Sequence, residues 1–139
     1  MVSNICLNQA VGALEGIAAQ RTNTARKNVM LANLYDPFVK SVMSYVLGIP
    51  NPGYNAKLIY SSVFYVAKPK MISDWYELME HFEKHQSSGD DNLLIAQYFI
   101  RQQPMEQWEV WRRILSKSFD IADKNILKQE LEEFNARTY

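Results

Sequence analysis

The sequence has very few of the residues that build cross-links and metal centres. Its single cysteine, Cys6, cannot form an internal disulfide, and with only two histidines the chain lacks a Cys/His set of the kind that holds structural zinc. A lone thiol between Ile5 and Leu7 is typical of a buried side chain in a reducing compartment. We therefore expect a cytoplasmic protein without a metal or another cofactor.

Glycine, proline and long apolar runs are also scarce. Five glycines and five prolines in 139 residues are too few for the turns of a many-stranded sandwich or barrel. No stretch approaches the roughly 20 apolar residues of a membrane span, and no basic segment precedes the first apolar residues. Because 47% of the residues are hydrophobic, the chain has enough apolar side chains for a core. We expect one folded domain over residues 1–139, with no membrane partner.

Net charge is absent too, but the charge is unevenly distributed along the chain. Fifteen basic residues balance fifteen acidic residues, which excludes a uniformly basic coat for nucleic acid. Residues 1–70 nevertheless carry a net charge of +5, and residues 71–139 carry −5. Such asymmetry between two halves is typical either of a basic binding surface or of ordinary scatter on a neutral protein.

Apolar residues recur three or four apart over most of the chain, which predicts helices. Asp36 and Pro37 form a clear helix start, because Asp caps free amides and Pro suits the first helical turn. Ser73 and Asp74 begin another helix in the same way. The pattern predicts an all-α fold, an irregular bundle of about seven helices, over approximately residues 4–17, 24–33, 38–47, 75–85, 93–100, 105–115 and 123–134.

Two segments do not follow the helical pattern. Residues 48–53 contain two glycines and two prolines, which predicts a loop. The run from Leu58 to Val66 is rich in β-branched and aromatic residues and suits a strand, yet it has no hairpin partner. Its conformation stays open at this point.

Several residue groups deserve testing as chemical sites. His81 and His85 are spaced to share a metal on one helix face, but no third ligand accompanies them and the pattern is not HExxH. Asp90 and Asp91 follow Gly89, which is typical of a helix cap and first turn rather than of an acid–base pair. The three tryptophans lie on apolar helical faces and indicate core packing. GxGxxG, GxxxxGK and GxSxG motifs are absent, so we expect no catalysis by this chain alone.

Two stretches resemble the amino-terminal helical domain of bacteriophage ATP-dependent DNA ligases. They are TARKNVMLANLYDPFVK at residues 24–40 and WRRILSKSF at residues 111–119. Residues 88–92, SGDDN, stand where that family has a small TGNAA-like loop, and residues 121–126 stand at its last motif. The similarity covers roughly residues 7–130.

The resemblance implies a wholly helical domain that binds nicked duplex DNA in the minor groove, while a separate domain transfers the nucleotide. No lysine here begins the KxDG motif of that separate domain, so the resemblance implies DNA holding without catalysis in the cytoplasm of a phage's host cell. The residues expected to contact phosphates are Lys117, Arg113, Arg112, Lys27, Arg26, Lys124, Asn125 and Ser88. We expect these cations to share one side that is free of carboxylates.

The sequence departs from the family pattern at one edge of the expected DNA surface. Asp120 and Ile121 replace the family's Cys-Gly, which places a carboxylate and a Cβ where a phosphate would approach. The alternative is therefore a phage protein that keeps the helical scaffold, has lost its DNA surface and binds a host or virion protein. Its contact surface would be the loop of residues 48–57, with Ile49 and Tyr54 exposed.

Overall fold

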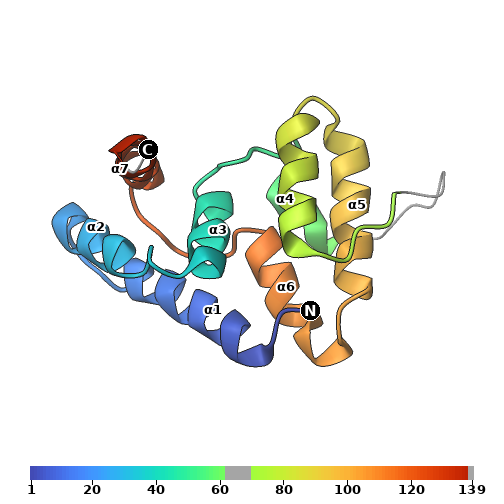
Figure 1. Ribbon diagram of the computed structural model, residues 1–139, viewed down its shortest axis with the longest axis horizontal. Coiled ribbons are helices and arrows are strands. Elements are labelled where there is room, and N and C mark those ends of the chain that lie inside the picture. Colours follow the sequence, from blue (N-terminus) through green and yellow to red (C-terminus); the bar gives the residue numbers. More distant parts are fainter. Residues whose placement is uncertain (62–69, 138–139) are drawn as a thin grey trace. The chain divides into compact units, whose positions relative to one another are not determined.

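Helices form every regular element that the structure, a computed structural model, contains within residues 1–61 and 70–137 (Figure 1). The all-α prediction is confirmed over these residues. The α-helices are α1 (Asn4–Ala18), α2 (Asn23–Ala32), α3 (Pro37–Val46), α4 (Trp75–Lys84), α5 (Gly89–Arg101), α6 (Trp108–Leu115) and α7 (Lys124–Arg137), and short 3₁₀-helices are η1 (Ala56–Tyr60) and η2 (Met105–Gln107).

The chain divides into two compact units. Unit 1 contains residues 50–118 together with Met1, and unit 2 contains residues 2–49 and 119–139. Unit 2 is therefore built from both ends of the sequence, whereas almost all of unit 1 is one continuous segment. A single domain over residues 1–139 stays a prediction.

Unit 2 consists of α1, α2, α3 and α7. Helix α1 packs against α2 and α3, and α2 packs against α7. Asp36 caps α3 as the sequence predicts, because its Oδ1 accepts hydrogen bonds from the amides of Phe38 at 2.9 Å and Val39 at 3.2 Å. Fully buried apolar side chains from three helices, Leu7, Leu14, Ile17, Val42, Met43, Leu127 and Leu131, form the core of this unit.

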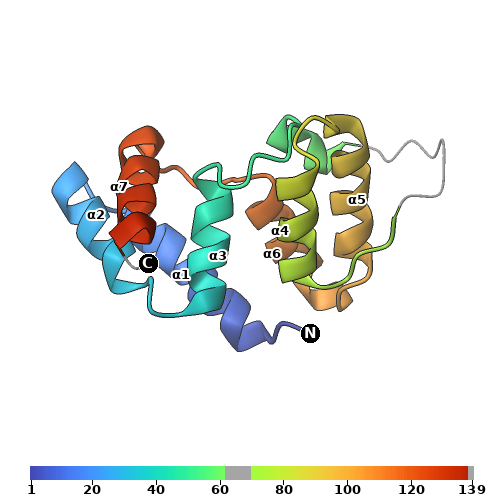
Figure 2. The ribbon, with the colours of Figure 1, turned by 45° about the horizontal axis from the view of Figure 1, so that its top comes forward.

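Unit 1 contains η1, α4, α5, η2 and α6. Helices α4 and α5 lie side by side and antiparallel (Figures 1 and 2), and the chain turns through η2 so that α6 packs back on α5. Pro104 therefore begins a single 3₁₀ turn rather than the α-helix itself. Trp75 of α4, Phe99 of α5 and Trp111 of α6 meet in the core, with ring centroids 5.0–6.3 Å apart.

The loop after α3 ends against α5 in an unusually close contact between two backbones. Gly53 has a φ of 81°, and a Cβ on either Gly53 or Gly89 would collide with backbone atoms across the contact. Asn92, fully buried, donates from its amide to the carbonyl oxygens of Pro52 at 2.9 Å and His85 at 2.8 Å. These hydrogen bonds hold the loop at the start of α5.

The expected exposure of Ile49 and Tyr54 is wrong, since both are half-buried. Tyr54 packs edge-to-face on Phe82 of α4, with the ring centroids 5.9 Å apart. The exposed apolar side chains in this region are instead Leu58 and Tyr60 of η1. Residues 56–60 of the ambiguous run form a 3₁₀ turn, and the part of that run from residue 62 onward lies outside the described residues.

Candidate nucleic-acid interface

The eight residues expected to contact DNA divide equally between the two units. Ser88, Arg112, Arg113 and Lys117 belong to unit 1, whereas Arg26, Lys27, Lys124 and Asn125 belong to unit 2.

Helix α6 directs its charged side chains away from the core of unit 1. Trp111, Ile114 and Leu115 are fully buried on one side of the helix. Glu109, Arg112 and Arg113 are spaced i, i+3 and i+4, which places them together on the opposite side. With Lys117 just beyond the helix, this segment brings together three predicted cations and one carboxylate. We call the side chains of Glu109, Arg112, Arg113 and Lys117 the α6 outer face.

The end of α6 is fixed by a turn that positions Arg113 and Lys117. Arg113 Nε donates to the carbonyl oxygen of Ser118 at 3.4 Å, and the Ser118 amide donates back to the Arg113 carbonyl at 3.0 Å. Lys117 has a φ of 56°, in the left-handed region that side chains other than glycine adopt infrequently. Arg112 lies over the Trp108 ring, with its Cζ 5.9 Å from the ring centroid. Its Nη1 is 3.4 Å from Glu109 Oε2.

In unit 2, Arg26 and Lys27 lie against carboxylates. Helix α2 packs on α7, so Arg26 points inward and is only 8% exposed. Its Nη1 is 2.6 Å from Asn23 Oδ1 and 3.8 Å from Asp123 Oδ2. Lys27 Nζ lies 3.9 Å from Glu130 Oε2. The expectation of cations free of carboxylates is therefore wrong for both residues, because Asp123, just before α7, and Glu130 on α7 lie beside α2.

The beginning of α7 holds the remaining candidates of unit 2. Lys124 is half-buried and Asn125 is exposed in the first turn, just after Asp123, whose φ is 56°. Asp120 is exposed. Ile121 is only 7% exposed, so its side chain belongs to the core rather than to a surface that a phosphate would approach.

Ser88 begins α5 beside an acidic hollow. An open depression of about 500 Å³ is lined by Gly53, Ser87, Ser88, Gly89, Asp90 and Asp91. Ser88 is the residue before the helix, and the two aspartates occupy its first turn, where their charge favours the helix dipole. The first-turn prediction for Asp90 and Asp91 is confirmed. Their two carboxylates make this hollow a poor place for a phosphate.

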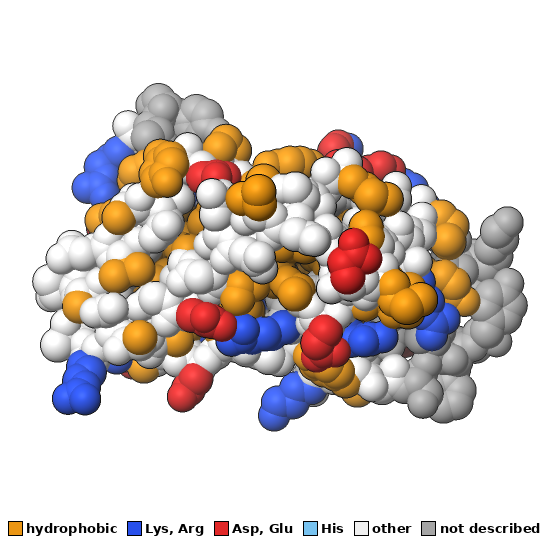
Figure 3. Space-filling view, turned by 90° about the horizontal axis from the view of Figure 1, so that it is seen from below, with side chains coloured by type: hydrophobic (Ala, Val, Ile, Leu, Met, Phe, Trp, Pro, Cys, Tyr) orange, Lys and Arg blue, Asp and Glu red, His pale blue; other side chains and the backbone are white. Residues whose placement is uncertain are grey.

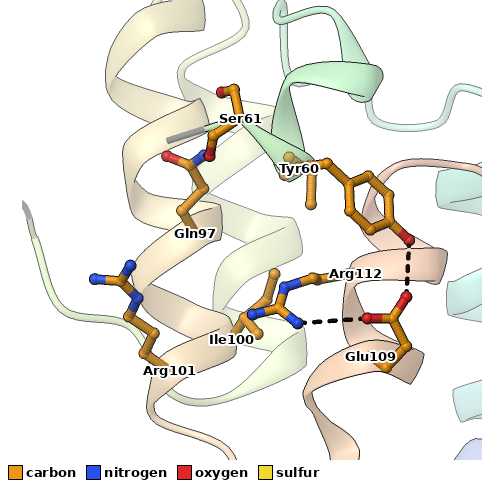
Figure 4. Close-up of a pocket in the computed structure, with 8 residues that line it drawn as sticks. Tyr60, Ser61, Gln97, Ile100, Arg101, Glu109 and Arg112 are labelled. Carbon is orange, nitrogen blue, oxygen red and sulfur yellow. Dashed lines mark hydrogen bonds and ion pairs between the residues drawn. The ribbon is translucent and has the colours of Figure 1, made fainter. Parts of the chain in front are cut away.

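A second, smaller pocket lies beside the α6 outer face. It has a volume of about 240 Å³ between η1, α5 and α6 (Figure 4), and its lining residues are Ile59, Tyr60, Ser61, Gln97, Ile100, Arg101, Glu109 and Arg112. We call it the Arg101–Arg112 pocket. Of these residues, the sequence pattern predicts only Arg112 as a contact.

Hydrogen bonds hold the walls of the Arg101–Arg112 pocket in place. Gln97 is buried and donates from its Nε2 to the carbonyl oxygens of Leu58 at 3.2 Å and Ser61 at 3.1 Å, which ties η1 to α5. Tyr60 Oη lies 3.4 Å from Glu109 Oε1, and Glu109 Oε2 lies 3.4 Å from Arg112 Nη1 (Figure 4). One carboxylate therefore orients both a phenol and a guanidinium.

Arg101 is a basic residue of this pocket that sequence reasoning missed. It ends α5, and its spacing from Arg112 in the sequence gives no hint that both reach one pocket. Its position becomes predictable only once the turn at residues 102–107 is known to reverse the chain. A basic residue in the last turn of a helix is also readily explained by the helix dipole, so the sequence gives no reason to single out Arg101.

The charge asymmetry between the sequence halves does not carry over to the folded units. Unit 1 holds eight basic and eight acidic residues, and unit 2 holds seven of each. On the face that Figure 3 draws, basic side chains are interspersed with acidic and hydrophobic ones. The positive charge of the first half is thus not gathered in one unit, and any basic surface is local.

His81 lies on α4, and His85 directly follows the helix. The rings of His81 and His85 are close, with centroids 4.4 Å apart. Within residues 1–61 and 70–137, no group of three or more His, Cys, Asp or Glu side chains is arranged to hold a metal ion. Glu80, one turn before Lys84, is paired with that lysine instead.

The histidine pair predicts a dependence of stability on pH. Burial lowers the pKa of His81 from its ordinary value of 6.5, and positive charge on His85 and Lys70 acts in the same direction. The unfolded chain therefore binds a proton more readily than the folded one. The free energy of unfolding should fall as pH drops through about 6.5 and stop falling below the lowered pKa.

Urea unfolding at pH 7.5 and pH 5.5 measures this effect. We expect His81→Gln to reduce the difference between the two pH values, because glutamine does not titrate. His85→Gln should retain part of the difference, since burial of His81 is the largest cause of the pKa shift. An unchanged pH dependence in His81→Gln would assign the effect to other groups.

No helix in the described part of the chain is long and apolar enough to cross a membrane. Comparison of the chain with protein-family models, curated proteins and solved structures finds no match.

Proposed function

We propose that the chain binds duplex or nicked DNA through the sugar-phosphate backbone and performs no catalysis itself. The observation that supports this function best is the α6 outer face, which contains the three cations Arg112, Arg113 and Lys117 together with Glu109. Lys and Arg side chains on a helix surface are typical contacts to phosphate oxygens, and such contacts carry no sequence information. The ligase-like, bacteriophage and cytoplasmic assignments belong to the same proposal, since they come from the resemblance of residues 24–40 and 111–119.

The ion pair between Arg112 and Glu109 does not prevent a contact with DNA. The carboxylate is 73% exposed, and pairs between exposed groups contribute only about 0–1 kcal/mol. A phosphate can therefore displace or share the guanidinium at small cost. Arg26 differs, because it is buried and would have to leave Asn23 and Asp123 before it could reach a phosphate.

Salt titration tests this function directly. Binding of labelled duplex is measured by fluorescence anisotropy at about 50–200 mM salt, where three phosphate contacts predict a slope of log K against log salt near −3. The double variant Arg113→Gln/Lys117→Gln should reduce the magnitude of the slope by about two. Lys84→Gln, which removes a cation from α4 of the same unit, is the matched control and should leave the slope unchanged. Absence of binding at the lowest salt concentration would refute the proposal.

The residues of unit 2 that are expected to contact DNA can be tested by the same salt titration, with one variant for each residue. A phosphate bound by Lys27 replaces Glu130 as its partner, so Lys27→Gln should reduce the magnitude of the slope by about one if this lysine contacts DNA. Arg26, Lys124 and Asn125 are tested in the same way, as is Ser88 in unit 1. Variants without effect would confine the interface to α6.

Binding to another protein is the second candidate function. It is favoured by exposed apolar side chains in unit 1, among them Met105, 73% exposed, and Leu58 and Tyr60 on η1. A host or virion protein that co-purifies with the chain, together with an absence of salt-dependent DNA binding, would support this function over the first. Charge neutrality of both units is compatible with such a partner.

A further inference from the structure

We propose that the Arg101–Arg112 pocket binds one nucleotide of unpaired DNA, with its phosphodiester on the two guanidiniums and its base on the ring of Tyr60. This inference rests on the proposed DNA-binding function and adds to it a preference for gaps or single-stranded ends. The charge, the size and the aromatic wall of the pocket support this site.

The charge of the pocket matches one phosphodiester. Arg101 and Arg112 contribute two positive charges, and Glu109 contributes one negative charge, which leaves a net charge of +1. A phosphodiester carries a single negative charge. Within residues 1–61 and 70–137, Arg101 has no carboxylate within ion-pair distance, and its guanidinium is positioned over the ring of Tyr98, with Cζ 5.7 Å from the ring centroid. This guanidinium is therefore both oriented and available to an anion.

The size of the pocket suits a fragment of a nucleic-acid strand. Its volume of about 240 Å³ lies below the range of roughly 300–1,000 Å³ typical of complete small-molecule sites. A phosphate and its sugar fill such a space. A base in a duplex cannot reach the pocket, because pairing and stacking hold it inside the double helix. The base of an unpaired nucleotide can instead turn outward to the rim.

Tyr60 supplies an aromatic surface at that rim. Its side chain is half-exposed, and its hydroxyl lies 3.4 Å from Glu109 Oε1, which holds the ring beside Arg112. Figure 4 shows the ring standing on η1 beside the guanidinium of Arg112. Stacking of bases on aromatic side chains next to cations is how proteins bind single strands without reading their sequence.

The test compares an intact duplex with a duplex that contains a four-nucleotide gap. We expect the unmodified protein to bind the gapped probe about tenfold more tightly at low salt, which is the size of effect that one stacked base produces. Tyr60→Leu should abolish this preference while binding of the intact duplex is retained. Tyr60→Phe should keep it, because the ring remains. Tyr76→Leu is the matched control, since Tyr76 is equally exposed in the same unit but lies on α4.

The role of the Arg101 guanidinium is tested with a separate variant. Arg101→Gln should lower the preference for the gapped probe to about unity, whereas Lys84→Gln, with the same change in charge, should preserve it. Circular dichroism verifies that each variant is folded. A gap preference that survives both Tyr60→Leu and Arg101→Gln would overturn the assignment of this pocket.

The remaining outcomes separate this inference from the proposed function. Binding of the intact duplex with no preference for the gap refutes the nucleotide site and leaves backbone binding intact. Failure to bind either probe refutes both. Competition by inorganic phosphate or a free mononucleotide as strong as that by a short oligonucleotide would show an anion site that does not recognise a strand, and would also overturn the inference.

Discussion

Replacing Trp111 by alanine should destabilise unit 1 by about 3–5 kcal/mol, the range for removing a large aromatic side chain from a core. Trp111 is fully buried, stacks on Trp75 with centroids 5.4 Å apart and meets Phe99 edge-to-face at 5.0 Å. Its Nε1 also donates to Gln107 Oε1 at 3.1 Å. The substitution therefore leaves a cavity between three helices and removes the partner of a buried amide.

Urea unfolding followed by circular dichroism measures this loss, and hydrogen exchange of the amides of α4, α5 and α6 locates it. Met105→Ala is the control, because a side chain 73% exposed should change the free energy of unfolding by less than about 0.5 kcal/mol. A loss below about 1 kcal/mol for Trp111→Ala would show that the three aromatic rings do not form the core described here.

Alanine at Gly89 should be nearly as damaging, although the change adds a single methyl group. The new Cβ would overlap the carbonyl oxygen of Gly53, and backbone cannot move aside as a flexible side chain can. Separation of the two backbones would also break the hydrogen bond from Asn92 to Pro52. Overpacking and a lost buried hydrogen bond together predict a destabilisation of about 2–5 kcal/mol.

Gly12→Ala is the matched control for this substitution. Gly12 lies inside α1 with nothing within 4 Å of an added Cβ, so alanine there should stabilise the protein by about 0.5–1 kcal/mol through its higher helix propensity. Thermal unfolding of both variants distinguishes the two effects by sign. Equal effects of the two substitutions would contradict the close backbone contact between Gly53 and Gly89.

Local chemistry explains why several helix ends could be predicted closely. Asp74 caps α4 by accepting a hydrogen bond from the Glu77 amide at 3.0 Å, within the four residues from which the cap was predicted. The end of α4 before His85 and the start of α7 after Asp123 follow equally short patterns. Helix caps and ends depend on residues that are close together in the sequence, so they can be predicted from the sequence alone.

The candidate site was less predictable because its geometry depends on residues far apart in the chain. Arg26 lies against Asp123, and Lys27 against Glu130, only because α2 packs on α7. A count of charges along the sequence assigns these cations to the basic half, residues 1–70. It cannot reveal that acidic residues of the other half lie beside them in the fold. In the same way, Tyr60 and Arg112 meet through Glu109 only after η1 has docked on α5 and α6.

The division of unit 2 between the two ends of the sequence has a consequence for synthesis. Helices α1, α2 and α3 leave the ribosome before Leu127 and Leu131, whose side chains complete their core, have been made. Residues 50–118 can fold during that interval because their core is formed within one segment. If they stayed unfolded, they would form a long loop between the two parts of unit 2, and closing that loop would cost entropy. Until residues 119–137 emerge, Arg26 lacks its partner Asp123 and Lys27 lacks Glu130, so the nascent chain is briefly more basic at α2 than the finished protein.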